Sequence, residues 1–160
     1  MNWALPVATI GLLSVCTVAG CGGGGAEIAK APGAGADRPV RIVDRSKPPH
    51  VRLPPGPPPS RLIVRDLQEG SGPAIPRKTN VRIRTNYVAV SYRTGRQYEV
   101  RWKPSGGFNI GFGKGIEIKG WEKGLSGMRV GGRRELIVPS ALAYGDGAAV
   151  YVIDLLAVER

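Results

Sequence analysis

Hydrophobic and polar residues alternate along residues 81–87, which is the period of a strand with one buried face. The inward-facing positions are Val81, Ile83, Thr85 and Tyr87, and the outward-facing positions are Arg82, Arg84 and Asn86. After a turn at residues 94–95, two more stretches, a return strand through 98–100 and an alternating segment at 108–112, predict further strands. Together these stretches predict an antiparallel sheet.

The spacing of apolar residues changes to three and four between residues 118 and 128, which is the period of a helix. The apolar positions are Ile118, Trp121, Leu125 and Met128. Gly124 and Gly127 limit the expected length of this helix. Residues 133–139 and 148–158 then predict two more strands. One short helix laid across an antiparallel sheet is an α+β domain.

Residues 1–20 carry no charged side chain and form an apolar run that ends in small residues, which is typical of a secretory signal peptide. The sequence VAGC at residues 18–21 resembles the bacterial lipobox, in which a diacylglyceryl group is attached to the cysteine and the signal is cleaved just before it. We therefore expect lipidation at Cys21. The alternatives are plain secretion and a retained transmembrane anchor, against which Pro6 and the absence of a basic stop signal argue.

Glycine and proline dominate much of residues 21–60, and they offer little apolar side chain to offset the entropy lost on ordering. We expect a tether that begins as a flexible coil and continues as extended polyproline II through residues 47–60. The proline stretch is alternatively a ligand for a proline-binding domain. The expected organisation is a signal peptide at 1–20, this tether, and one folded domain at 61–160.

The chain has a formal net charge of +11, which raises nucleic acid as a partner. Its basic residues are scattered singly along the expected strands, however, and neither a recognition helix nor an aromatic-basic RNA motif accompanies them. We therefore expect no nucleic acid partner. Anionic lipid headgroups or cell-wall polymers are a better electrostatic match, and the alternative is a solvated basic surface.

The expected domain lacks the residues that most catalytic chemistries need. The single histidine, His50, falls in the tether, which excludes a Ser-His-Asp triad and a histidine metal site in the domain. The phosphate-binding patterns GxGxxG and GxxxxGK[ST] are absent, so we expect no metal and no cofactor. The remaining candidates are aromatic side chains from separate elements, namely Tyr87, Tyr98, Phe108, Trp121, Tyr144 and Tyr151.

Four segments resemble the signature blocks of the FKBP-type peptidyl-prolyl isomerases, in order and at close to family spacing. They are DLQEGSGP, NYVAVSYRTGRQYE, GFGKGIEIKGWEKGLSGMRVGGRRELIVPSALAYG and YVIDLLAVE. The resemblance covers nearly all of residues 61–160. It implies an antiparallel half-barrel sheet wrapped around one short helix. It also implies cis-trans rotation of X-Pro bonds, which uncatalysed crosses a barrier of about 18–20 kcal/mol.

The resemblance also implies the residues of the site. Trp121 would be the floor on which the proline ring sits, and the walls would be Tyr87, Tyr98, Phe108 and Tyr151. The backbone N–H of Ile118 and the hydroxyl of Tyr144 would hold substrate carbonyls, while Glu99 takes the place of the family's aspartate. The alternative for these aromatic side chains is that they only fill the core.

The sequence departs from the family pattern at four places. Tyr98 stands where phenylalanine is usual, Glu99 is one methylene longer than aspartate, and Glu117 stands where the family commonly has valine. The loop after ALAYG is roughly ten residues shorter than the family's, because DGAA replaces a longer segment. We expect Tyr144 to remain as a carbonyl donor at a site that has lost one wall, with low activity or broad substrate choice.

The sequence therefore predicts a monomeric isomerase, lipid-anchored through Cys21 in the bacterial cell envelope, with its domain outside the cytoplasm. Its partners would be proline-containing segments of exported proteins. One alternative is a non-catalytic peptide-binding module that keeps the fold with an impaired pocket. A second is an adhesive cationic lipoprotein that binds anionic envelope polymers.

Overall fold

The computed structural model of the chain describes residues 29–30, 44–77, 80–113, 115–143, 145 and 147–159. The expected signal peptide, the lipidation site Cys21 and the expected carbonyl donor Tyr144 lie outside these residues. The expected tether is described in part, from residue 44 onward and at the backbone of 29–30.

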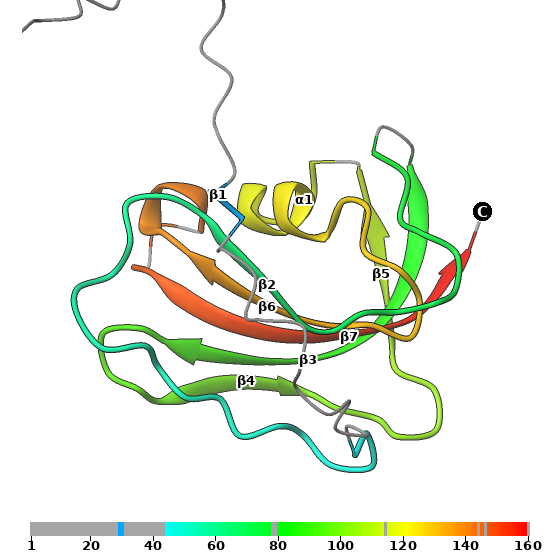
Figure 1. The fold of residues 1–160 in the computed structure, drawn as a ribbon, viewed down its shortest axis with the longest axis horizontal. Coiled ribbons are helices and arrows are strands. Elements are labelled where there is room, and N and C mark those ends of the chain that lie inside the picture. The colour runs from blue at the N-terminus through cyan, green and yellow to red at the C-terminus, as the bar shows by residue number, and fades with distance from the viewer. Residues whose placement is uncertain are drawn as a thin grey trace, which may run out of the picture.

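The described residues form one sheet, with one α-helix lying across it (Figure 1). The elements are β1 (Ala29–Lys30), β2 (Ile63–Gln68), β3 (Val81–Ser91), β4 (Gln97–Arg101), β5 (Phe108–Phe112), α1 (Lys119–Leu125), β6 (Arg133–Val138), the 3-10 turn η1 (Ser140–Leu142) and β7 (Ala149–Glu159). The strand order is β1-β2-β6-β7-β3-β4, and β5 pairs with β3 as well. Every pair is antiparallel except the short parallel pair of β1 and β2. The predicted α+β fold class is confirmed.

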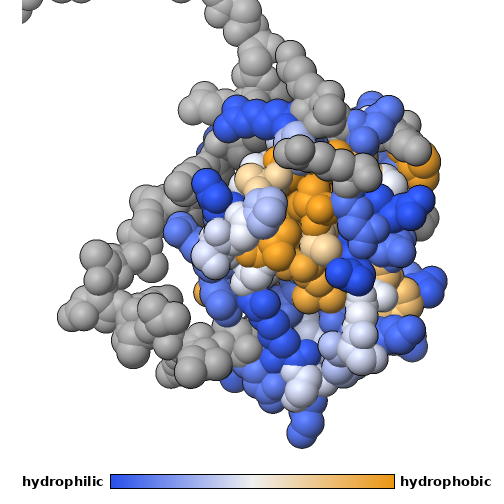
Figure 2. Space-filling view, turned by 90° about the vertical axis from the view of Figure 1, so that its right-hand side faces the viewer, coloured by the Kyte–Doolittle hydropathy of each residue, from blue (hydrophilic) through white to orange (hydrophobic). Residues whose placement is uncertain are grey.

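The main core lies between α1 and the sheet. Its buried side chains come from α1, from the segments around it and from the strands below it, and they include Ile83, Trp121, Leu125, Met128, Leu136 and Ile153. Seen from the side on which β5 lies, apolar side chains gather in one surface patch with hydrophilic side chains around it (Figure 2). Part of the apolar content of the domain therefore reaches the surface on this side.

The glycines of α1 let the helix approach β6 very closely. A Cβ atom at Gly120 would lie 2.5 Å from a methyl carbon of Val138, and one at Gly124 would lie 2.6 Å from a methyl carbon of Leu136. Real Cβ atoms do not come this close to other atoms, so only glycine fits these two positions without a shift. Gly127 has φ of +76°, which ends the helix as its spacing predicts.

The opposite face of the sheet is covered as well, because residues 44–60 run across it. Val51 and Leu53 pack beside Tyr92, Ile137 and Val150 on this face. In Figure 1 this cyan segment passes below the sheet, whereas α1 lies above it. The sequence assigns these residues to the tether, and the boundary at residue 60 stays a prediction. The contacts show that their prolines and apolar residues lie against the sheet.

Tyr92 holds the proline-rich part of this segment through its hydroxyl group. That hydroxyl lies 3.2–3.4 Å from the backbone carbonyl oxygens of Pro54, Gly56 and Pro57. Proline lacks an N–H but keeps a strong carbonyl acceptor, so a tyrosine hydroxyl is a suitable partner for such a backbone.

Burial on both faces also explains why the alternation in β3 is incomplete. Thr85 and Asn86 are both buried, with 0% and 2% of their surface exposed, so the prediction that Asn86 faces outward is wrong. The register shift between Arg84 and Thr85 in the pairing with β7 leaves Leu156 of β7 as the extra residue, so the alternation along β3 itself continues and Asn86 is buried on the second face of the sheet. The Asn86 amide is satisfied by the backbone of Lys103, to which it donates and from which it accepts a hydrogen bond.

A buried ion pair connects β6 and β7 under residues 44–60. Arg133 donates two hydrogen bonds to the carboxylate of Asp154, at 2.5 and 2.8 Å, and the Asp154 side chain is fully buried. Arg45 lies 3.7 Å from the same carboxylate and donates to the carbonyl of Gly131. The indole of Trp102 covers the Arg133 guanidinium, with its ring centroid 5.4 Å away. Each charge in this buried group therefore has a partner of opposite sign or an aromatic face.

We expect Asp154→Asn to lower the free energy of unfolding by about 3–5 kcal/mol, because it leaves the Arg133 charge buried without its counterion. The matched control is Asp66→Asn, which breaks the more exposed pair of Asp66 with Arg134 and should cost about 1 kcal/mol or less. Urea unfolding of both variants provides the comparison. Equal losses in the two variants would contradict the assignment of a buried, mutually dependent pair.

Candidate functional site

Three aromatic rings from three elements meet beneath the beginning of α1. Trp121 lies in the first turn of α1 with 3% of its surface exposed, and Tyr151 of β7 has 6% exposed. The Trp121 ring meets Tyr87 of β3 edge-on at a centroid distance of 4.9 Å, and meets Tyr151 edge-on at 5.6 Å. Edge-to-face pairs at these distances are favourable beyond their burial, so the indole is held in one orientation.

The indole N–H of Trp121 is buried, and no described residue accepts a hydrogen bond from it. Leaving such a donor without an acceptor costs about 1–3 kcal/mol. A side chain that only filled the core would favour leucine or phenylalanine here, since neither has a donor to satisfy. Core filling alone does not account for this unsatisfied N–H, and the role of Trp121 as a pocket floor stays a prediction.

Two hydrogen bonds connect the rings to the outer strand β4. The hydroxyls of Tyr98 and Tyr151 lie 2.9 Å apart, although 54% of the Tyr98 surface is exposed. The extra hydroxyl at position 98, which the sequence identifies as a departure from the family, thus meets a second hydroxyl across the site. Glu99 accepts a hydrogen bond from the Tyr87 hydroxyl. The pKa of Tyr87 is raised well above its usual range, first by burial and then by the charge of Glu99 and this hydrogen bond. Tyr87 therefore stays a neutral donor at physiological pH.

Arg101 is a site residue that the sequence did not single out. Its guanidinium lies 3.0 Å from the Glu99 carboxylate and stacks over the ring of Phe108 at 5.6 Å. Glu99 and Arg101 are two residues apart on β4, so they lie on the same face of the strand. An acidic and a basic residue two positions apart on one strand were the signal in the sequence that could have identified Arg101. Phe108 is therefore positioned by Arg101 at the edge of the ring cluster.

Ile118 is buried and precedes α1 as its N-cap. Its carbonyl accepts hydrogen bonds from the backbone N–H groups of Trp121 and Glu122. Among the hydrogen bonds between described residues, none uses the backbone N–H of Ile118 as donor. Within the described part of the chain this N–H has no acceptor, and its expected role as a donor to a bound carbonyl stays a prediction.

Glu117 lies beside Ile118 and is half-buried. Burial raises the pKa of Glu117 above the usual glutamate value, and the charges of Glu99 and Glu122 raise it further. The charge of Glu117 also contributes, after burial and Glu99, to the raised pKa of Tyr87. The sequence thus places a half-buried carboxylate directly before the buried Ile118.

The structure brings together most of the residues that the sequence assigns to the site. Its contacts connect Tyr87, Tyr98, Glu99, Trp121 and Tyr151, with Phe108 at the edge and Ile118 beside Trp121 in the core. The position of Tyr144 stays a prediction, since it lies outside the described residues. The expected shortening of its loop relative to the family also stays a prediction, although β6 and β7 are joined here by residues 139–148.

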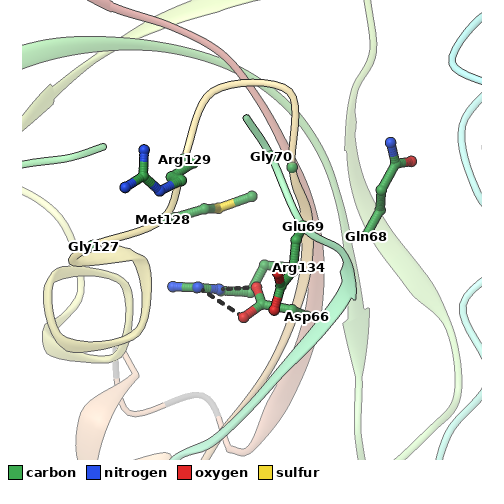
Figure 3. Close-up of a pocket in the computed structure, with 9 residues that line it drawn as sticks. Asp66, Gln68, Glu69, Gly70, Gly127, Met128, Arg129 and Arg134 are labelled. Atoms are coloured by element: carbon green, nitrogen blue, oxygen red, sulfur yellow. Dashed lines mark hydrogen bonds and ion pairs between the residues drawn. The ribbon is translucent and has the colours of Figure 1, made fainter. Parts of the chain in front are cut away.

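Two pockets in the described part of the chain lie away from these rings. One, of about 190 Å³, is lined by polar groups near the end of α1, where Asp66 and Arg134 form a two-point ion pair at 2.7 and 3.0 Å (Figure 3). The other, of about 550 Å³, lies between Pro58, Pro59 and Tyr92 and the residues before β7. Within the described ranges, no group of histidine, cysteine, aspartate and glutamate side chains is arranged to hold a metal ion.

Residues 73–154 match the family model of the FKBP-type peptidyl-prolyl cis-trans isomerases. This span contains all the rings described above and covers half of the chain. The chain belongs to this family. The FKBP-type chain is 39% identical to an FK506-binding protein of Streptomyces anulatus over 121 residues, covering 69% of this chain and 96% of that protein. A probable FK506-binding protein of Corynebacterium glutamicum is 33% identical over 117 residues, covering 68% and 96% respectively.

Solved structures agree with the fold of this FKBP-type domain. A peptidyl-prolyl cis-trans isomerase from Pseudomonas syringae superimposes with a TM-score of 0.52 and 25% identity, covering 62% of this chain and 76% of that one. FkpA from Escherichia coli superimposes with a TM-score of 0.54 and 23% identity, covering 62% of this chain and 48% of that one. The likeness to FkpA shows a shared fold.

We expect Glu117→Gln to raise the free energy of unfolding at pH 7 and to leave it nearly unchanged at pH 3. The folded chain holds the Glu117 proton to a higher pH than the unfolded chain does, because its pKa is raised. Glu117 therefore destabilises the fold as the pH rises through and above the ordinary glutamate range, and glutamine removes that effect. Urea unfolding at both pH values measures the difference. Glu69→Gln, at an exposed position, is the control, and a loss of stability at pH 7 in Glu117→Gln would overturn the expectation.

Proposed function

We propose that the chain assists the folding of exported proteins, by binding X-Pro segments against Trp121 and favouring the twisted amide. The observation that carries this proposal is the buried indole held edge-on between Tyr87 and Tyr151. A planar prolyl amide owes its stiffness and much of its dipole to resonance, and both decrease in the twisted transition state. An apolar, water-poor surface therefore favours the twisted form over the planar one.

The groups around the indole suit this reaction because none has to exchange a proton. The Tyr87 hydroxyl stays protonated, and Glu99 is occupied by Tyr87 and Arg101. The Ile118 N–H would receive one substrate carbonyl, and Tyr144, at a position outside the described residues, would donate to another. An acceleration of five decades would need only about 7 kcal/mol of preferential binding to the transition state.

The alternative of a non-catalytic peptide-binding module would use the same rings without favouring the twisted amide. The FKBP-type relatives support the enzyme as the first choice. We further propose that the chain acts as a monomer outside the cytoplasm, attached to a membrane through a lipid on Cys21. The support for this is the VAGC sequence after an uncharged apolar segment. In the described residues, no helix has the length and apolar character that a membrane crossing requires.

We expect Trp121→Phe to lower kcat/KM on a Leu-Pro peptide by about tenfold, equivalent to about 1.4 kcal/mol of transition-state stabilisation. The smaller ring cannot supply the same floor. Trp102→Phe is the matched control, because Trp102 makes its contacts with Arg45 and Arg133 under residues 44–60. An isomerase assay on both folded variants is the measurement. Equal losses, or no isomerase activity in the unmodified chain, would remove the proposed role of the ring cluster.

We expect Cys21→Ser to abolish incorporation of a labelled fatty acid when the full chain is expressed in a bacterium that processes lipoproteins. Serine has the same size but no thiol to receive the diacylglyceryl group. The matched control is Cys16→Ser, which should still be labelled because the signal is removed after residue 20. Labelling that persists in Cys21→Ser would end the proposal of this anchor.

A further inference from the structure

The ring that would receive a substrate proline is almost fully covered in the free chain. Trp121 has 3% of its surface exposed, and Tyr151, which meets it edge-on, has 6%. The two pockets described above lie elsewhere in the structure. A binding site has to offer its ligand an open, concave surface. If a proline is to sit on this indole, a group at the edge of the ring cluster must therefore move first.

Tyr98 is the ring that reaches across this cluster from the last strand of the sheet. β3 lies between β4, which carries Tyr98, and β7, which carries Tyr151. The two hydroxyls are nevertheless 2.9 Å apart. The Tyr98 side chain therefore passes over β3, on the face where Ala89 packs with Trp121 and Tyr151. Ala89 pairs with Tyr151 in the sheet, and its small side chain leaves room for this passage.

The backbone of β4 allows Tyr98 to change its direction. In the pairing with β3, Ala89 lies opposite Glu99, whereas Val90 lies opposite Gln97. Tyr98, between the two, is thus the extra residue of a β-bulge, a feature that redirects side chains next to active sites. β4 is also the last strand in the order, and all its residues except Glu99 are exposed. Such an edge segment opens at lower cost than a central strand does.

The other rings of the cluster are held more firmly. Tyr87 and Tyr151 lie on β3 and β7, which have neighbouring strands on both sides, and each packs edge-on against Trp121. By contrast, 54% of the Tyr98 surface is exposed, so this ring can turn into solvent with little loss of packing. Turning it breaks the hydrogen bond to Tyr151.

We propose that Tyr98 is a gate, which its hydrogen bond to Tyr151 holds closed over the ring cluster in the free chain. A proline-containing segment binds when the Tyr98 ring has turned away and uncovered the indole. This inference rests on the proposed function, since it concerns access to the same site. The apparent affinity for the segment is then reduced in proportion to the fraction of chains whose gate is open. Removing one of the two hydroxyls should raise that fraction about threefold to tenfold, the range for the loss of one hydrogen bond.

The first test follows the exposure of Trp121 by acrylamide quenching of its fluorescence. In the full chain with Trp3→Phe and Trp102→Phe, Trp121 is the one indole left. Adding Tyr98→Phe should raise the quenching constant about threefold or more, because acrylamide reaches the indole in the open form. Tyr151→Phe removes the same hydrogen bond from its other end and should have the same effect.

The matched control is Tyr92→Phe, which removes a hydroxyl on the opposite face of the sheet and should leave the quenching of Trp121 unchanged. The double variant Tyr98→Phe with Tyr151→Phe should be quenched no more than either single variant, since both changes break one bond. If circular dichroism shows that one single variant does not fold, the other still tests the same bond.

The second test measures isomerase activity on a Leu-Pro peptide in the full chain with its tryptophans intact. In Tyr98→Phe and in Tyr151→Phe, KM should fall about threefold or more while kcat changes little, because the gate controls entry and not the rotation itself. A tyrosine that acted only as a wall of the site would not give this separation of KM from kcat.

The outcomes separate the gate from the proposed function. Quenching of Trp121 that stays the same in Tyr98→Phe would overturn the gate, whatever the activity. An increase in only one single variant, or a further increase in the double variant, would also overturn it, because the bond between the two hydroxyls would then not hold the gate closed. Raised quenching with an unchanged KM would overturn the gate as the route of entry. Raised quenching without catalysis on the peptide would support the gate and contradict the isomerase proposal.

Discussion

The close contact between α1 and β6 is the constraint on which the site depends. Gly120 and Gly124 bring the helix backbone against the methyl groups of Val138 and Leu136, at a distance that no side chain could occupy. Trp121 is adjacent to Gly120, so the depth of the helix fixes the depth of the indole. At that depth the rings of Tyr87 and Tyr151 reach it edge-on from two neighbouring strands. A helix held one methyl group farther away would leave a gap between these rings, and a packed interior does not tolerate such gaps.

The proposed reaction needs no proton transfer, so the charged groups of the site matter only through where they lie and how they attract or repel one another. Tyr87 is a neutral donor because burial and Glu99 favour its protonated form. The Glu99–Arg101 pair keeps its charges together at the outer strand, where solvent screens them. Glu117 departs from this arrangement, since its carboxylate is partly withdrawn from water and faces like charges. Such a group lowers the stability of the folded domain at neutral pH, because folding raises its pKa.

The α+β class, the strand at 81–91, the short helix and the residues around Trp121 could all be predicted from the sequence. They depend on local periodicity and on segments whose glycines and aromatic residues have one consistent interpretation. The burial of Asn86 could not be predicted, because it depends on a tertiary contact with the backbone of Lys103, which follows it by 17 residues. The composition of residues 44–60 did not predict their contacts, because proline and glycine indicate a free tether. These contacts depend on Tyr92, Ile137 and Val150, which lie much later in the sequence. Arg101 was missed because its spacing from Glu99 is visible in the sequence, whereas its contact with Phe108 of another strand is not.

Two segments that precede β2 pack against the folded domain. Residues 44–60 cross the face of the sheet opposite α1 (Figure 1), and β1 (Ala29–Lys30) pairs with β2 at the edge of the sheet. If Cys21 is held at a lipid surface as proposed, only residues 22–28 separate it from β1, so this edge of the sheet would lie within about 30 Å of the membrane even when they are fully extended.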